Sequence, residues 1–391
     1  MNNQAARITK HSSTGNDGRL YVAFELSKQS WKLGFSDGRC ERARIRTMEA
    51  RDFQKLREEL RLAKKHFGLA ERVAVVSCYE AGRDGFWLHR AMEERGVENV
   101  VVDAASIDVQ RRKRAKTDRL DAEALVRKLV QHGRGERYAW SVVRVPSRQA
   151  EDGRQLNREI AVLQSEQRQH RTRIQSLLFA QGRDVKVTAR LTRELATLTC
   201  WDGQPLGADL RERIGRELQR LQMVEQQLKQ LRQEQAARLK QQRTPALEKI
   251  RLLQQLCGLA MTSSWIFVME LFGWRQFSNR RQLAGALGLA PMPYQIGDSS
   301  REQGISRGGN GRVRAMAIEI AWSWLRYQPR SALSQWYQQR FGSGGKRLRR
   351  IGIVAMARRL MIDLWRYIEH GIVPPGAVLK KATAAETLVA E

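Results

Sequence analysis

The feature that most constrains this chain is a change in the spacing of its apolar residues near residue 150. Between residues 20 and 131, short apolar runs of strand length alternate with segments of helical spacing. Beyond residue 151, two long stretches carry apolar residues at steps of three and four among Gln, Arg and Glu. Because such steps indicate helices and short apolar runs indicate strands, we expect an α/β domain followed by helical parts.

Five strands and three helices are predicted before residue 132. Strand-like runs occupy residues 20–26, 31–35, 43–48, 72–78 and 99–102, and helical spacing occupies 51–67, 84–95 and 117–131. Three hairpin-type strands followed by β-α units is the arrangement of ribonuclease-H folds. That arrangement makes the first and fourth strands neighbours.

The rest of the chain is predicted to be mainly helical. Residues 151–181 and 207–243 fit a long antiparallel helical hairpin, interpreted as a spacer or dimerisation arm, with a loop around 202–207. Short helices between glycine turns follow Pro245 and resemble helix-hairpin-helix modules, and 291–311 is expected to be a loop. The expected divisions are 1–18 (disordered), 19–145 (α/β), 146–245 (helical hairpin), 246–375 (C-terminal domain) and 376–391 (loose tail).

Charge points to a nucleic-acid partner. The chain has 70 Lys and Arg against 41 Asp and Glu, a formal charge of +29 that is spread along its length. Such an excess attracts a polyanion, for which DNA or RNA is the leading candidate. The four cysteines form no metal-ligand pair, which favours free thiols and a cytoplasmic location. The longest apolar run, 265–272, is too short to span a bilayer, so no membrane partner is expected.

Four carboxylates carry the predicted chemistry. Asp118 and Asp121 stand at i and i+3 in the first turn of a predicted helix, where acids also complement the helix dipole without any other role. Glu25 lies on the first strand, and Glu80 follows the fourth. If these strands are adjacent and the helix packs on them, the four acids converge. Mutual repulsion would then favour a divalent cation, Mg²⁺ or Mn²⁺, as counter-charge.

Basic residues near these acids, and farther along the chain, are candidate phosphate contacts. A solvated surface is the alternative interpretation for each group, and it is nearly as strong for the group after Gly345. The candidates are Arg111, Arg112, Lys113, Arg114 and Lys116 before the acidic helix, then Arg301, Arg307, Arg312 and Arg314, and finally Lys346 and Arg347.

Three segments in the N-terminal part, Tyr21–Ser27, Tyr79–Gly82 and Lys116–Ala122, resemble the insertion sequence 110 family of DEDD transposases, which includes Piv-type DNA invertases. Leu287–Pro291 and Gln303–Asn310 extend the resemblance into the C-terminal half. The resemblance implies a RuvC-like domain with a four-acid metal site, a coiled coil used for assembly into a dimer or tetramer, and a C-terminal domain with a serine nucleophile. It also implies site-specific recombination that moves the element, guided by a bridge RNA that pairs with donor and target DNA.

Two positions depart from the family pattern. Glu25 stands where the family has Asp, which keeps the charge. Ile296 stands where the nucleophilic serine is expected, followed by Gly297-Asp298-Ser299-Ser300. This copy is then inactivated or altered, or Ser299 or Ser300 takes over, or the alignment is offset in this segment. A metal-dependent junction nuclease and a nucleic-acid-binding remnant are the alternative functions.

Overall fold

The computed structural model describes residues 18–40, 42–103, 106, 118–136, 140–296 and 299–380, of which 293–296 and 299–303 are described by their backbone. The expected disordered N-terminus, up to residue 17, and residues 381–391 of the expected loose tail lie outside these ranges. Residues 376–380 are held in place, because Leu379 forms a β-bridge with Leu256 and the Lys380 amide donates to the Gln255 carbonyl at 2.6 Å. The chain divides into two compact units, Met1–Val145 and Pro146–Glu391.

The first unit is built on a five-stranded mixed sheet of order β3-β2-β1-β4-β5. The strands are β1 (Leu20–Leu26), β2 (Ser30–Ser36), β3 (Arg44–Glu49), β4 (Val75–Glu80) and β5 (Glu98–Val102). The first three pair as antiparallel hairpins, whereas β4 pairs in parallel with both β1 and β5. The predicted adjacency of the first and fourth strands is therefore confirmed.

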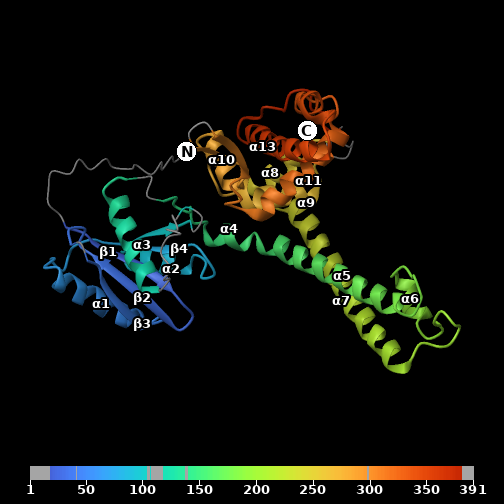
Figure 1. Cartoon of the computed structure of the whole chain (residues 1–391), viewed down its shortest axis with the longest axis horizontal. Coiled ribbons are helices and arrows are strands. Elements are labelled where there is room, and N and C mark those ends of the chain that lie inside the picture. The colour runs from blue at the N-terminus through green and yellow to red at the C-terminus, as the bar shows by residue number, and fades with distance from the viewer. Residues whose placement is uncertain are drawn as a thin grey trace. The chain divides into compact units, whose positions relative to one another are not determined.

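Helices cover both faces of this sheet (Figure 1). On one face, α1 (Phe53–His66) and α2 (Trp87–Glu93) contribute to a core that includes Phe24, Trp31 and Tyr79. On the other face, α3 (Asp118–Gly133) packs Leu125, Val126 and Leu129 against alternate residues of β1 and β4. The α/β prediction for this part of the chain is confirmed, with element limits close to those expected.

The second unit begins with a helical arm. Helices α4 (Arg148–Asp152) and α5 (Gln155–Phe179) lead out, and α7 (Ala208–Gln241) returns beside α5 (Figure 1). The predicted helical hairpin is confirmed, but its connection is longer than the expected loop and contains α6 (Ala189–Glu194), whose Leu191 is buried at the far end of the arm. That end has an apolar core of its own.

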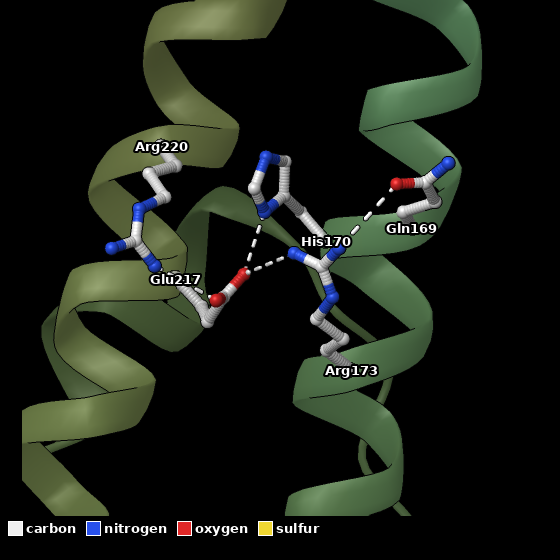
Figure 2. A network of polar contacts seen from close by, with 5 residues as sticks. All are labelled: Gln169, His170, Arg173, Glu217 and Arg220. Carbon is white, nitrogen blue, oxygen red and sulfur yellow. Dashed lines mark hydrogen bonds and ion pairs between the residues drawn. The ribbon is translucent and has the colours of Figure 1, made fainter.

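A buried carboxylate joins the two long helices of the arm. Figure 2 shows Glu217 of α7 between His170 and Arg173 of α5, with Arg220 on its own helix. The Glu217 carboxylate oxygens lie 2.6 Å from His170 Nδ1, 3.4 Å from Arg173 Nη1 and 2.8 Å from Arg220 Nη1. Burial raises the pKa of the Glu217 carboxyl, but the hydrogen bond with His170 and the nearby charges of Arg173 and Arg220 outweigh burial and hold the pKa below its ordinary value.

The remainder of the second unit is a helical domain around a large apolar core. This core also includes Leu156, Ile160, Val224 and Leu228 of the arm, so the arm and the domain share one interior. The helices are α8 (Pro245–Gln254), α9 (Met261–Phe267), η2 (Val268–Phe272), α10 (Arg280–Leu287), α11 (Gly311–Tyr327), α12 (Ala332–Tyr337), η3 (Gln338–Gly342) and α13 (Lys346–His370). Both η segments are single π-helical turns that continue a preceding α-helix.

The expected loop at 291–311 is wrong over most of its length. The structure has an antiparallel hairpin there, β6 (Pro291–Ile296) and β7 (Ser299–Ile305). Two prolines in β6 and the polar side chains of β7 conceal the pairing, since proline disfavours strands and cross-strand hydrogen bonds need no apolar side chains. Gly297-Asp298 between the strands is a two-residue hairpin signal that could have predicted it.

Within the part of the chain that the structure describes, no helix is long and apolar enough to cross a membrane.

Candidate active site

Glu25 and Glu80 are neighbours on adjacent parallel strands. The paired register of β1 and β4 ends at Phe24 and Tyr79, and the two glutamates follow directly. Side chains alternate between the faces of a strand. Ala23 and Cys78, two residues before them, pack in the core under α3, so both glutamates belong to the face that α3 covers. Glu25 is half-buried and Glu80 is exposed.

Helix α3 approaches this face closely at Gly34 of β2. A Cβ atom at Gly34 would lie 2.8 Å from the Ala122 carbonyl oxygen, so a side chain there would push the helix away. Asp118 and Asp121 lie in the first turn of this helix, immediately before Ala122. The structure therefore brings the acidic turn of α3 to the sheet face that carries Glu25 and Glu80.

Lys32 links this acidic turn to β1. Its ammonium nitrogen lies 2.8 Å from Asp118 Oδ2, and Lys32 is the register partner of Glu25 across the β1–β2 pair. The Lys32 and Asp118 side chains are 30% and 66% exposed, so solvent screens the pair and its contribution to stability is small. The pair instead shows where the residues lie: Lys32 is next to Glu25 on the adjacent strand and next to Asp118 on α3.

Glu25 and Glu80 lie on the sheet face that α3 covers, and Asp118 is tied to that face through Lys32. Among the residues that the structure describes, no three His, Cys, Asp or Glu side chains are grouped so that they could hold a metal ion. Convergence of the four acids around a metal ion stays a prediction, and in the structure the charge of Asp118 is met by Lys32. The donor set itself consists of carboxylate oxygens, which are the ligands that Mg²⁺ and Mn²⁺ prefer.

The C-terminal hairpin places the expected nucleophile position opposite one of its alternatives. Ile296 at the end of β6 pairs with Ser299 at the start of β7, and Gln295 pairs with Ser300. Arg301 pairs with Tyr294. Ser299 is thus the cross-strand neighbour of the slot in which the family pattern has its serine.

The base of this hairpin is fixed by close backbone contacts with the end of α10. The Ser306 amide donates to the Ala290 carbonyl at 2.9 Å, and the Arg307 amide donates to Gly288 at 3.2 Å. Gly288 itself has a φ of +65° and ends α10 in the left-handed region that favours glycine. Arg307 has a φ of +56°, which is uncommon for a residue with a side chain.

A sequence model described as "Transposase IS116/IS110/IS902 family" matches residues 250–338, which include this hairpin. A Sinorhizobium fredii (strain NBRC 101917 / NGR234) protein named "Putative transposase y4rJ" is 38% identical over 384 residues, covering 93% of this chain and 95% of that protein. The chain belongs to the IS116/IS110/IS902 transposase family. A second protein of the same strain, "Putative transposase y4qE", is 28% identical over 264 residues, covering 68% of this chain and 62% of that protein.

Membership in this transposase family confirms the resemblance expected from the sequence and supports a transposase function. The matched segment contains η2, α10, the β6–β7 hairpin and α11. The identity to "Putative transposase y4rJ" covers 93% of this chain, so the relationship extends well beyond the segment at 250–338.

The candidate phosphate contacts of this transposase-family chain fall into three groups. Arg111, Arg112, Lys113, Arg114 and Lys116 lie outside the described residues. Arg307 and Arg312 flank the start of α11 and are exposed, as are Lys346 and Arg347 in the first turn of α13.

Arg314 donates hydrogen bonds to two backbone carbonyls. Its Nη1 donates to the Leu287 carbonyl at 3.2 Å and to the Gly308 carbonyl at 2.9 Å. These bonds fasten the loop after β7 to the end of α10. Arg314 therefore supports the base of the hairpin, in addition to any contact that its remaining N–H groups make.

Two charged residues of the site region were not singled out from the sequence. Lys32 follows from the hairpin register, because the turn at Ser27–Ser30 places residue 32 opposite Glu25. Glu270 is an acid inside the most apolar run of the chain, Trp265–Phe272, and its side chain is 1% exposed. An acid in such a run signals a buried ion pair, since an unpaired buried charge is costly.

Proposed function

We propose that this chain cuts and rejoins DNA strands as a transposase or site-specific recombinase that moves its own insertion sequence. The observation that carries the proposal is that, in a transposase-family chain, Glu25 and Glu80 lie on the sheet face covered by α3, the helix whose first turn contains Asp118 and Asp121. The chain also has 70 basic against 41 acidic residues, which suits a polyanionic substrate, and these acids are the residues that would bind a metal ion.

These four carboxylates would hold Mg²⁺ or Mn²⁺ in a RuvC-like, ribonuclease-H-type domain. When bound, such ions stabilise charge on the attacking and leaving oxygens of a phosphodiester. Glu25 and Glu80 would provide the fixed side of the site, since both are anchored on strands. Asp118 and Asp121 would provide the helical side, with Asp118 turning from Lys32 toward the ion.

A serine of β7, Ser299 or Ser300, would supply the nucleophile of the C-terminal hairpin. Its hydroxyl oxygen would bond to phosphorus while the bond to the departing strand breaks and the proton passes to the departing oxygen. The phosphoserine link conserves a phosphodiester, so reversal onto a new strand end rejoins DNA without another energy source. Pairing of Ser299 with Ile296 supports this assignment, because the two positions lie directly opposite each other across the hairpin.

RNA guidance and self-assembly belong to the same proposal. A bridge RNA from the element would choose donor and target by base pairing, while the protein's basic groups hold backbone phosphates. The arm formed by α5 and α7 would join copies of the chain into a dimer or tetramer. Its support is a set of exposed apolar side chains on the arm, Val162, Phe179, Trp201 and Met223.

Ile296 favours one other function, a nucleic-acid-binding protein that has lost strand transfer. Isoleucine has no nucleophilic atom, so this function holds if neither serine of β7 reacts. A plasmid excision assay with the element's ends separates three functions: recombination, cleavage by a metal-dependent nuclease, and binding alone. Rejoined plasmid supports recombination, nicked or linear product without joining indicates a metal-dependent nuclease, and binding without cleavage indicates the impaired protein.

A further inference from the structure

Glu270 is a fully buried carboxylate at a break in helical regularity. It lies in the π-helical turn η2, and its side chain is 1% exposed. Burying an ionised carboxylate is costly unless it is paired and hydrogen-bonded. Single π-helical turns also occur frequently at functional sites. The partners of Glu270 therefore indicate what this turn holds together.

The first partner comes from the arm, 112 residues away in sequence. Arg158 of α5 donates Nε to Glu270 Oε1 at 2.8 Å and Nη2 to Oε2 at 2.9 Å, a two-pronged pair. Such bidentate pairs fix both the distance and the orientation of the groups. Burial raises the pKa of the Glu270 carboxyl, but the hydrogen bonds from Arg158 and Asn310 outweigh burial and hold the pKa below its ordinary value.

The second partner comes from the loop that follows β7. Asn310 donates Nδ2 to Glu270 Oε2 at 3.1 Å, while its Oδ1 accepts from the Arg312 and Val313 amides at the start of α11. Asn310 thus caps α11 with one end of its amide and binds Glu270 with the other. The Asn310 backbone amide also donates to the Ala286 carbonyl of α10 at 2.9 Å.

This loop has little freedom to adjust by itself. Gly309, with a φ of +69°, lies against the Ala286 carbonyl, and Gly288 lies against the Gly308 carbonyl. A side chain at either glycine would meet backbone. Movement of Asn310 must therefore displace the loop and the base of the β6–β7 hairpin together.

We propose that Glu270 is a positioning residue that ties the β6–β7 hairpin to helix α5, so that a change in the arm changes the hairpin. The inference rests on the proposed function only for the role of that hairpin in DNA chemistry. The connection itself is a property of the second unit and is tested without DNA. Its use would be to make strand exchange depend on the state of the arm.

Hydrogen–deuterium exchange on the full chain tests the connection. The variants are Glu270→Gln, Arg158→Gln in α5, and Asn310→Ser, which keeps a hydroxyl acceptor to cap α11. The slowest amides of α13 report global opening. We expect exchange in 299–310 to accelerate about tenfold relative to α13, since a charged hydrogen bond to a buried partner is lost. A purely structural role would accelerate both segments equally.

Glu217→Gln is the matched control, because it removes the other buried carboxylate that α5 contacts. It should loosen the far part of the arm and leave exchange in 299–310 unchanged. If Glu270→Gln does not fold, Arg158→Gln and Asn310→Ser decide the matter alone. Unchanged exchange of 299–310 in those two variants, or an equal change in Glu217→Gln, would overturn the proposal. These exchange measurements do not test whether the chain joins DNA, so the proposed function is tested separately.

Discussion

Ile296 and Ser299 are register partners across the β6–β7 hairpin. Directly opposed residues of an antiparallel pair have Cα atoms about 4.5–5.5 Å apart. The position expected to carry the nucleophile and its first alternative are therefore separated by roughly one strand spacing. If the nucleophilic hydroxyl is on Ser299 instead of residue 296, the DNA phosphate needs to shift by only about that spacing to meet it.

The first prediction concerns this pair of positions. Ser299→Ala combined with Ser300→Ala should abolish strand joining, while DNA binding persists, because the hydroxyl nucleophile is removed and the basic residues remain. Ile296→Ser in that background should restore joining by at least about tenfold over the double variant. Gel assays of joined product and mass-spectrometric mapping of the DNA–protein adduct measure both effects. Unchanged joining by the double variant would exclude both serines.

The acids of α3 give the second prediction. Asp118→Ala or Asp121→Ala should remove Mg²⁺-dependent cleavage by a factor of about 100 or more, with DNA binding largely kept, because oxygen ligands are lost while the basic surface remains. Asp209→Ala, an acid in the first turn of the arm helix α7, is the control and should retain activity. Full activity of the α3 variants in excess EDTA would refute the metal site.

Lys32 leads to the third prediction, which needs no DNA. Its ammonium meets the charge of Asp118, so it competes with any divalent ion that Asp118 binds. Lys32→Gln should raise the affinity for Mn²⁺ by roughly three- to tenfold, a modest factor because the pair is partly exposed. Isothermal titration calorimetry on the full chain measures this change, with Lys55→Gln on α1 as the control. A lower affinity would show that Lys32 instead holds Asp118 ready for the ion.

The fourth prediction concerns stability and pH in the arm. The pKa of Glu217 is lowered in the folded chain. Its pairing therefore stabilises the fold fully at pH values above 4.5, the ordinary pKa of a glutamate. This contribution is lost as the pH falls from 4.5 through the folded pKa. Glu217→Gln should lower the free energy of unfolding by roughly 2 kcal/mol at neutral pH, and the difference should vanish in acid. Urea titrations at several pH values measure it. A difference that does not depend on pH would contradict the assigned ion pairs. Glu212→Gln is the control: its pair with Arg216 is exposed, so the free energy of unfolding should change little.

Assembly through the arm is the fifth prediction. Met223 and Val162 are 63% and 51% exposed on α7 and α5. Replacing both with Lys should shift an even-numbered assembly toward monomer, because it places charge in an apolar contact. Light scattering coupled to gel filtration, with nucleic acid present, measures the mass. Leu348→Lys on α13 is the control outside the arm. A monodisperse wild-type monomer on nucleic acid would contradict assembly.

The α/β unit and the arm were predicted from the local spacing of apolar residues. The valine run before Cys78 and the apolar run from Leu20 to Leu26 each indicate a buried strand without reference to any other part of the chain. Once the first and fourth strands are neighbours, Glu25 and Glu80 must lie side by side. Helical stripes likewise predicted α5 and α7, because each repeats its spacing over many turns.

Features that depend on distant partners were missed. Glu270 is defined by Arg158 and Asn310, and nothing in the spacing of residues 112 and 40 positions apart indicates that they meet. The β6–β7 hairpin was missed for a local reason: β6 contains two prolines and β7 is polar, so neither has the usual pattern of a strand. The position of Lys32 could have been predicted from the sequence, because the turn at Ser27–Ser30 sets its register opposite Glu25.

The most direct test of the recombinase proposal is a plasmid excision assay that sequences the rejoined junction. The wild-type chain and Ile296→Ser are supplied with the element's ends and its non-coding RNA in Mg²⁺. The proposal predicts a precise, religated junction from at least one of the two proteins, lost with Asp121→Ala. Cleaved ends without a joined junction from both proteins, or equal joining by Asp121→Ala, would contradict it.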